Sequence, residues 1–236
     1  MVEQGADIID IGGESTRPGS ERVDAKEQKR RVIDVIAGLR KELAEHIHIS
    51  IDTTLFEVAK AALDAGATML NDISAGREDE SLIRLAVEYD TPICLMHMQG
   101  APGTMQDNPS YENVTHEIGE FLQQRADYAE SIGVKKESII LDPGIGFGKR
   151  TQHNLEILRD LSEITNLGYP VLLGTSRKRF MGDIAREEDP HNRMPATCAT
   201  SALGVIAGVK IFRVHDVWQN RQALDVTWAI QHGNSK

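Results

Sequence analysis

Polar side chains follow every apolar run that is typical of a β-strand in this chain. In "IIDIGGESTRPG" (8–19), the run breaks at Gly12-Gly13 into groups able to bind an anion or a polar ligand. The polar ends of the seven runs are Glu14-Ser15-Thr16-Arg17, Asp52, Asn71-Asp72, His97, Asp142, Ser176-Arg177-Lys178, and Arg213 with His215. Any one of them could be only a solvated strand end or a helix cap. Because the carboxyl ends of parallel strands share one face of a barrel, seven together predict an active site there.

Two chemistries are indicated by these residue types. Arg213 and His215 stand at positions i and i+2, so both side chains would project to one side of a strand and form an anion clamp. Asp52, Asn71 and Asp142 offer oxygen acceptors, which suit a ligand with several N–H donors in a plane. The sequence therefore predicts a site for a small ligand with an anionic part and a planar part.

The elements that would position these groups repeat one pattern of helix, glycine stop, short β-run and polar loop. The seven β-runs begin near residues 7, 46, 67, 91, 138, 170 and 210, with amphipathic helical segments between them. The first helix is predicted from Asp24 to Ala44, with Asp24 as N-cap. This alternation favours βα units and a parallel sheet. No linker or shift in composition divides residues 1–236, so we expect one barrel domain, with long loops at 98–112 and 177–192.

The first residues have the form of a unit whose beginning is absent. "MVEQGADIIDIGG" matches "ALDAGATMLNDIS" in pattern: the end of a helix, a glycine stop and a strand. Only four residues precede the first of these glycines, and four residues cannot make a stable helix. We therefore expect an α/β fold, a (β/α)8 TIM barrel that lacks its first strand and most of its first helix. An open, doubly wound sheet of seven strands is the alternative.

Composition narrows the classes of partner. Charged residues make up 26% of the chain and hydrophobic residues 40%, which is ordinary for a globular protein. No apolar run approaches the roughly 20 residues of a membrane span. The net charge of −10 weighs against nucleic acid, which needs a basic face. Cys94 and Cys198 form no CxxC or metal-ligand spacing and are expected to be core residues, with a cytoplasmic location as the default expectation.

Seven short motifs follow one another along nearly the whole chain: "DIGGESTRPG", "SIDTT", "NDIS", "CLMHMQG", "LDPGIGFGK", "GTSRKRF" and "RVHDV". In this order and at these intervals they resemble the dihydropteroate synthase family of folate biosynthesis. The resemblance implies a transferase that condenses 6-hydroxymethyl-7,8-dihydropterin diphosphate with 4-aminobenzoate, giving 7,8-dihydropteroate and diphosphate. It also implies Mg²⁺ as cofactor, a target for sulfonamides, and a homodimer formed through barrel helices near the C-terminus.

The resemblance implies a role for individual residues as well. The pterin ring would be bound by Asp52, Asn71, Asp142 and Lys178. The diphosphate would lie against Arg213, the backbone near Val214, and His215, with Thr16 close by. The residues that would shape the 4-aminobenzoate site are Thr16, Arg17, Pro18, Phe147, Ser176 and Lys178. Catalysis would be carried by Asp52, Asp142, Lys178, Arg213 and His215. The cationic groups and Mg²⁺ would stabilise the leaving diphosphate, and a carboxylate would stabilise a cationic pterin.

One departure from the family bears on the metal. The family's Mg²⁺ ligand is an Asn in an "NVTPDSFSDGG"-like segment at the end of its first strand, and this sequence has no such segment. No residue of this chain is therefore expected to ligate the metal. Two alternatives to an active synthase remain, a pterin-binding homologue without catalysis or an inactive truncated fragment. A barrel isomerase for a sugar phosphate would need only the anion clamp and would not explain Asp52, Asn71 and Asp142 together.

Overall fold

Seven parallel strands form the centre of the structure, a computed structural model that describes residues 1–17, 19–101 and 103–233. The strands are β1 (Ile8–Gly12), β2 (His48–Asp52), β3 (Met69–Asp72), β4 (Ile93–Met96), β5 (Ile139–Asp142), β6 (Leu172–Leu173) and β7 (Ile211–Phe212). Each begins within two residues of the start that the apolar runs predict. All seven predicted strands are therefore confirmed.

The strands neighbour one another in chain order. β1 to β5 form one parallel ladder and β6 with β7 forms a second, and a bridge between Leu141 and Val171 joins β5 to the second ladder. This order is that of a barrel, and it excludes the doubly wound alternative, in which the strand order reverses. Among the described residues, β1 and β7 stand at the two ends of the order. The additional first unit that the family resemblance implies stays a prediction.

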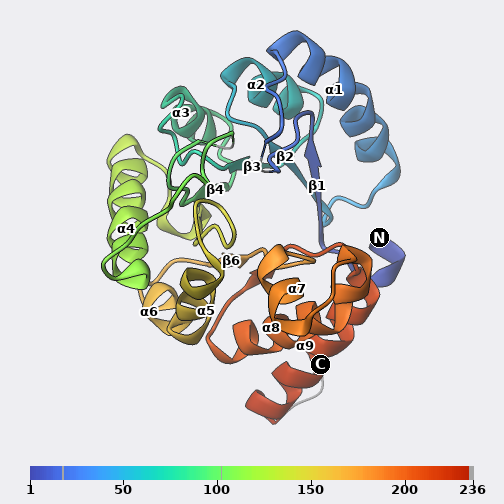
Figure 1. The fold of residues 1–236 in the computed structure, drawn as a ribbon. Coiled ribbons are helices and arrows are strands. Elements are labelled where there is room, and N and C mark those ends of the chain that lie inside the picture. The colour runs from blue at the N-terminus through green and yellow to red at the C-terminus, as the bar shows by residue number, and fades with distance from the viewer. Residues whose placement is uncertain (18, 102, 234–236) are drawn as a thin grey trace.

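Helices surround the strands as an outer ring (Figure 1). They are α1 (Ala25–Glu42), α2 (Phe56–Asp64), α3 (Ser81–Glu88), α4 (Val114–Ile132), α5 (Thr151–Arg159), α6 (Leu161–Thr165), α7 (Arg179–Ala185), α8 (Met194–Ile206) and α9 (Val217–His232), with single 3-10 turns at Val2–Gln4, Lys136–Ser138 and Pro190–Arg193. α1 begins as predicted, because Asp24 accepts a 2.8 Å hydrogen bond from the backbone N–H of Glu27. The segment expected as a loop at 177–192 is partly helical, since it contains α7.

No helix within these described ranges is long and apolar enough to cross a membrane. Cys94 is buried and Cys198 half-buried, and both are free thiols. The core role expected for Cys94 is confirmed, whereas Cys198 lies at the edge of the packing. The cytoplasmic location stays a prediction.

Side chains that point into the barrel form two layers. The lower layer is an apolar cluster whose members are Ile8, Met69, Cys94, Ile140, Leu172 and Ile211. Because side chains on one face of a strand recur every second residue, the next inward position lies two residues further on. That position is polar on five strands, where the residues are Asp10, Asn71, Asp142 and Arg213, together with Asp52, which lies level with Asn71. An apolar floor therefore supports a polar layer at the carboxyl ends of the strands.

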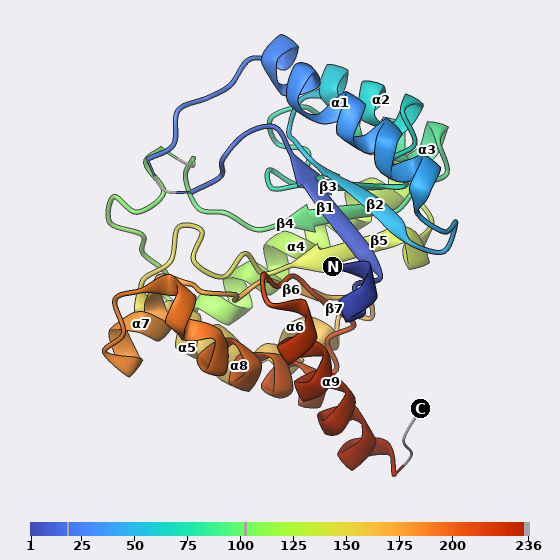
Figure 2. The ribbon, with the colours of Figure 1, turned by 90° about the vertical axis from the view of Figure 1, so that its right-hand side faces the viewer.

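The opposite face of the strands packs against the ring of helices. Strand residues such as Ile51, Leu70 and Leu141 share the main hydrophobic core with helix residues such as Ile36 and Ile118. Figure 2 shows the loops after β1, β4 and β5 on one side of the barrel, together with α7 after β6. The fold thus directs its polar layer toward a mouth bordered by these loops.

Candidate active site

A charged cluster in the polar layer joins three strands. Nη2 of Arg213 lies 3.1 Å from Oδ2 of Asp142, and its Nη1 lies 3.8 Å from Oδ2 of Asp10. The other oxygen of Asp142 accepts a 2.7 Å hydrogen bond from the backbone N–H of Gly144. Arg213 thereby connects β7 to β5 and β1, and both oxygens of Asp142 are engaged.

Burial shifts the acidity of this cluster. The pKa of Asp52 is raised to about 7, first by burial and then by the negative charge of Asp10, with Arg213 opposing the shift. Burial also raises the pKa of Asp10, although its side chain keeps 26% exposure at the edge of β1. Burial opposes the charge of Arg213, yet the neighbouring carboxylates, Asp142 foremost, raise its pKa overall. Arg213 is therefore a cation near neutral pH, whereas Asp52 holds its proton to a higher pH than an ordinary carboxyl group does.

Two polar side chains of the site have unused hydrogen-bonding capacity. Asn71 is 1% exposed, and neither Oδ1 nor Nδ2 has a partner among the residues that the structure describes. Asp52 lies beside Asn71 in the register of β2 and β3, and no described residue donates a hydrogen bond to its carboxylate. A buried amide without partners is unfavourable unless a ligand bonds to it. A planar ligand with both donors and acceptors at its edge would satisfy both side chains.

The loop after β5 meets the turn after β6 at Lys178. The Nζ of Lys178 donates a hydrogen bond to the carbonyl oxygen of Ile145 and lies 4.9 Å from the centroid of the Phe147 ring. Burial lowers the pKa of Lys178 to about 7, and the charge of Asp142 opposes the shift. Phe147 and Lys178, both predicted for the site, are thus brought together by the structure, and they offer a flat apolar surface beside a titratable amine.

Lys149 fixes the glycine-rich loop after β5. It is 3% exposed, and its Nζ lies 3.0 Å from Nδ1 of His97 and 2.9 Å from the carbonyl oxygens of Gly144 and Phe147. Burial lowers the pKa of Lys149, and burial also lowers the pKa of His97, to about 2. His97 is therefore a neutral acceptor inside the protein. It was expected to be part of a functional face, and the structure gives it a supporting role instead.

Ser176 and His215 join the ends of β6 and β7. The hydroxyl oxygen of Ser176 accepts a 3.1 Å hydrogen bond from the backbone N–H of His215 and lies 2.9 Å from Nδ1 of its ring. When the Ser176 hydroxyl donates its hydrogen to Nδ1, the neutral ring carries its own proton on Nε2. Burial, with the charge of Arg177, lowers the pKa of His215. The predicted clamp therefore combines a cation, Arg213, with a neutral donor, His215, and Val214 lies half-buried between them.

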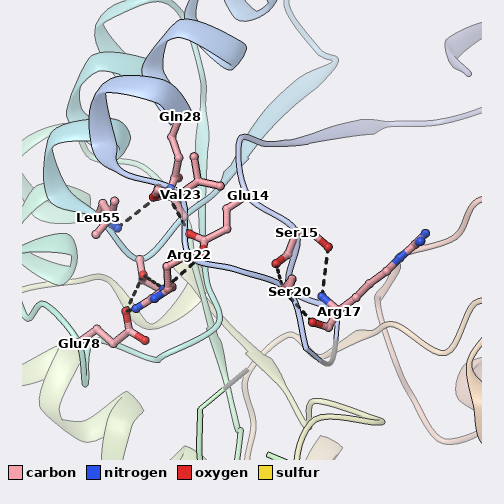
Figure 3. Close-up of polar contacts among 11 residues, drawn as sticks. Glu14, Ser15, Arg17, Ser20, Arg22, Val23, Gln28, Leu55 and Glu78 are labelled. Atoms are coloured by element: carbon pink, nitrogen blue, oxygen red, sulfur yellow. Dashed lines mark hydrogen bonds and ion pairs between the residues drawn. The ribbon is translucent and has the colours of Figure 1, made fainter. Parts of the chain in front are cut away.

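Arg22 holds the loop after β1 to the loops after β2 and β3 (Figure 3). Its guanidinium bonds to Glu78, lies 3.8 Å from Oε1 of Glu14, and donates to Oγ1 of Thr54 at 3.5 Å. Gln28, which is buried in α1, donates a 2.8 Å hydrogen bond to Oε2 of Glu14. These contacts fix both Glu14, where the loop leaves β1, and Arg22, where it returns to α1.

The three loop residues predicted to contact 4-aminobenzoate have different surroundings. Thr16 is half-buried and lines a crevice together with Asp52. Arg17 is exposed, and its side chain points away from Arg22 (Figure 3). Pro18 lies outside the described residues. Of the two described residues, Thr16 is therefore the one that lies next to the polar layer, in a crevice that Glu14 and Ser15 also line.

Comparison with known proteins shows which family has this arrangement. The family described as "Pterin binding enzyme" matches residues 1–215. The dihydropteroate synthase of Synechocystis sp. is 46% identical over 230 residues, which are 98% of this chain and 79% of that protein. This chain belongs to the dihydropteroate synthase family. A second dihydropteroate synthase, from Haemophilus influenzae, is 43% identical over 226 residues, 96% of this chain and 81% of that protein.

Solved structures of dihydropteroate synthases share the fold. The Yersinia pestis enzyme, crystallised with a sulfonamide drug complex, gives a TM-score of 0.92 at 36% identity, covering 98% of this chain and 82% of that one. The Clostridium difficile enzyme, in the presence of pteroic acid, gives 0.90 at 47% identity, with 97% and 84% covered. The Xanthomonas albilineans enzyme with 4-aminobenzoic acid gives 0.91 at 41% identity, with 98% and 81% covered.

The residue roles that the family resemblance implies cover most of the polar layer but omit one member, although the motif "DIGGESTRPG" begins with it. Asp10 belongs to the charged cluster, and it stands two residues beyond the inward-facing Ile8, so strand alternation would have identified it. Asp72, counted among the polar strand ends, does not serve the site. Its two oxygens accept hydrogen bonds from the backbone N–H groups of Ser74 and Gly76, and so it caps its own turn.

Proposed function

We propose that this chain joins 4-aminobenzoate to 6-hydroxymethyl-7,8-dihydropterin diphosphate. The amine nitrogen attacks the exocyclic methylene carbon, the bond from that carbon to the diphosphate oxygen breaks, and the amine loses a proton. The products are 7,8-dihydropteroate and diphosphate. The observation that carries the proposal is Asn71, whose buried amide has an unpartnered donor and an unpartnered acceptor beside Asp52. A pterin presents both kinds of group at the edge of one flat ring.

The polar layer would bind the pterin ring. Asp52 accepts N–H groups when it is ionised, and Asn71 both donates and accepts. Asp142 is held by Arg213 and a backbone N–H, so its carboxylate is already oriented before the ligand binds. As the carbon–oxygen bond breaks, positive charge develops on the pterin. Fixed carboxylates in a site shielded from water stabilise that charge more than bulk water would.

Arg213 and His215 would assist the departure of diphosphate. The amine of 4-aminobenzoate is a weak nucleophile, so the barrier falls mainly through stabilisation of charge on the leaving oxygen. Arg213 supplies a half-buried cation, and His215 supplies a ring N–H donor, which is at Nε2 when the Ser176 hydroxyl donates to Nδ1. Arg213 and His215 can stabilise the leaving diphosphate without transferring a proton. A strong general base is therefore not required.

The 4-aminobenzoate would lie between the loop after β1 and the turn after β6. Thr16 stands on one side, and Ser176, Lys178 and Phe147 stand on the other. The ring of Phe147 suits an aromatic substrate, and the amine of Lys178 suits its carboxylate. The Xanthomonas albilineans enzyme was solved with 4-aminobenzoic acid and the Yersinia pestis enzyme with a sulfonamide drug complex. We infer that this chain binds both kinds of compound here.

Mg²⁺ is proposed to enter with the diphosphate. No group of three or more His, Cys, Asp or Glu side chains in the described part of the chain is placed to hold a metal ion. Arg213 and His215, the residues assigned to the leaving group, are a cation and a neutral donor, so they do not fit a resident Mg²⁺. Its oxygen ligands would come from the substrate phosphates and water. The steps carried by the protein's own residues do not run through the ion.

A homodimer is proposed through α8 and α9, which lie side by side (Figure 1). The large apolar side chains most exposed on these helices are Leu203 at 52%, Trp218 at 53%, Ile206 and Val226 at 60%, and Ile230 at 77%. A second copy packed against them would remove this apolar surface from water. Val226→Glu is expected to give a monomer in sedimentation, and a variant that remains a dimer would exclude this face.

Product formation tests the function. The purified chain is incubated with both substrates and Mg²⁺, and 7,8-dihydropteroate and diphosphate are quantified. We expect the two products in equal amounts, and neither of them without 4-aminobenzoate or after chelation of the metal. Calorimetry on the same sample measures the affinity for a pterin. Pterin binding without product under any condition would refute the proposal and identify a non-catalytic homologue.

A further inference from the structure

Arg177 has a backbone conformation that a residue with a side chain rarely keeps without support. Its φ is +59°, in the left-handed region. Its backbone N–H donates to Oγ1 of Thr197 at 3.2 Å, and its carbonyl oxygen accepts a 3.2 Å hydrogen bond from Nη1 of Arg193. Strained residues persist only where their surroundings fix them, and they are frequent at functional sites. The neighbours of Arg177 in this turn are Ser176 and Lys178, which face the proposed 4-aminobenzoate site.

Asp216 fixes the side chain of the same arginine from the end of β7. Nε of Arg177 donates to Oδ2 of Asp216 at 3.1 Å, and Nη2 donates to Oδ1 at 2.6 Å, so the ion pair is bidentate. The two side chains are only 21% and 18% exposed, so salt and water weaken the pair less than they weaken a pair on the open surface. The remaining nitrogen, Nη1, lies 2.9 Å from Nδ1 of His191. All three guanidinium nitrogens are therefore engaged.

This ion pair stands next to the contact between Ser176 and His215. Two adjacent residues after β6 thus bond to two adjacent residues after β7. The ladder between these strands pairs only two residues of each. Short backbone pairing constrains the strand ends weakly, so the side-chain contacts are left to set the position of the 175–178 turn, which the backbone closes with a 3.1 Å hydrogen bond from Lys178 to Thr175.

We propose that Asp216 is a positioning residue for the 4-aminobenzoate site. Through Arg177 it keeps the 175–178 turn in the left-handed form that presents Ser176 and Lys178 to the substrate. The proposal rests on the proposed synthase reaction, in which Asp216 contacts neither substrate. It concerns the second substrate more than the first, because Asp52 and the other main pterin contacts lie on β2, β3 and β5.

Three variants separate charge from backbone conformation. Asp216→Asn keeps the size of the side chain but removes its charge. Arg177→Gly removes the ion pair while suiting the left-handed φ, because glycine carries no Cβ. The double variant combines both changes. Asp90→Asn is the control. Asp90 pairs with a cation, Lys135, at 2.7 Å, as Asp216 does, and has a positive φ, as Arg177 does, but it lies between α3 and β4, before the strand begins.

The readouts are steady-state kinetics for each substrate and hydrogen exchange of the backbone amides at 176–178 and 215. Asp216→Asn should raise KM for 4-aminobenzoate about tenfold or more, with a much smaller change in KM for the pterin diphosphate, and should speed exchange at these amides. Hydrogen exchange at these amides should be slower in Arg177→Gly than in Asp216→Asn. The double variant should match Arg177→Gly, because the pair is already broken. Asp90→Asn should change neither readout.

Two results would overturn the positioning role: an unchanged KM for 4-aminobenzoate in Asp216→Asn, or an equal rise in KM for both substrates. The proposed function fails by a different result, the absence of product from the unsubstituted chain. In that case the exchange data decide the question alone. Protection at 176–178 that is the same in Asp216→Asn and in the unsubstituted chain would then refute the role of Asp216.

Discussion

The two halves of the barrel hold their site residues by different means. β1 to β5 contribute four or five residues each to one continuous ladder, whereas β6 and β7 pair through two residues each. In the first half, the side chains of Asp52 and Asn71 have no hydrogen-bond partner among the described residues. In the second half, the side chains of Ser176 and Arg177 bond to the residues after β7. Two polar side chains of the well-paired half are therefore left for a ligand, although Asp10 and Asp142 of that half are paired with Arg213, whereas the site residues after β6 and β7 are bonded to each other.

This difference has a physical reason. A side chain on a long ladder is oriented by the strand itself, so its polar atoms can stay unpaired until a ligand arrives, at a cost in stability. A side chain on a short ladder needs neighbours to orient it, and these contacts use part of its hydrogen-bonding capacity. Substitutions in the first half should then affect ligand binding more than folding. Substitutions in the second half should affect the geometry of the site and the fold together.

Arg213→Ala should have the largest effect, because Arg213 links the two halves. Its removal leaves Asp142 and Asp10 without their cation, which we expect to cost roughly 3 kcal/mol of unfolding free energy. Turnover should fall by at least about a hundredfold, since a main stabiliser of the leaving group is lost. Thermal unfolding and product assays measure both effects. His215→Ala is the comparison, and it should weaken the diphosphate substrate while leaving a phosphate-free pterin bound. Equal losses for both ligands in His215→Ala would argue against its place at the diphosphate.

Asp52→Asn should separate binding from stability. The amide cannot accept N–H groups as an anion does, so pterin affinity measured by calorimetry should fall about tenfold or more. The protein should nevertheless gain unfolding free energy at pH 8, on the order of 1 kcal/mol, because a desolvated charge has been removed. A variant that loses both affinity and stability would show that Asp52 supports the barrel rather than the ligand.

The protonation of Asp52 should also make pterin binding depend on pH. Its pKa is raised to about 7 in the folded protein, so the ionised acceptor becomes available as the pH rises through 7. Apparent affinity should increase up to about tenfold between pH 6 and 8. Between about pH 4 and 7 the folded state holds a proton that the unfolded state has released, so stability should fall as pH rises across this window. Both trends should be weaker in Asp52→Asn, and what remains should come from Asp10, whose pKa is also raised, and from Lys178, whose pKa is lowered to about 7.

The strand positions and most of the polar layer could be predicted from the sequence because both follow simple periods. An apolar run with a polar end marks a buried strand and its carboxyl terminus, and parallel order brings seven such ends together. Asp10 obeys the same period, but it sits inside an apolar run, so it does not stand out as the polar end of a strand. His97 and Asp72 have the right residue type at the right place, yet their polar atoms bond to Lys149 and to a local turn. Residue type alone does not reveal that a group is already engaged.

Contacts between distant segments could not be predicted. Arg177 and Asp216 are 39 residues apart, and nothing in the motif "GTSRKRF" shows that its first arginine adopts a left-handed conformation. Lys149 is surrounded by carbonyl oxygens only because the loop after β5 folds back over it. Such partners depend on the path of the backbone between strands, which has no period in the sequence.

Arg22→Ala should give the smallest effect. It tests whether a substitution in the loop after β1, like others in the first half of the barrel, affects ligand binding more than folding. Arg22 is 54% exposed, and ion pairs of this kind contribute little to stability. Its loss frees the loop that carries Thr16 from Glu78 and Glu14, so KM for 4-aminobenzoate should rise about two- to fivefold while pterin affinity stays the same. Arg30→Ala is the matched control, because Arg30 also forms an exposed ion pair but points outward from α1. If the two variants have the same KM for 4-aminobenzoate, Arg22 does not hold the loop in its working position, and the wall formed by Ser176 and Lys178 is sufficient to bind the second substrate.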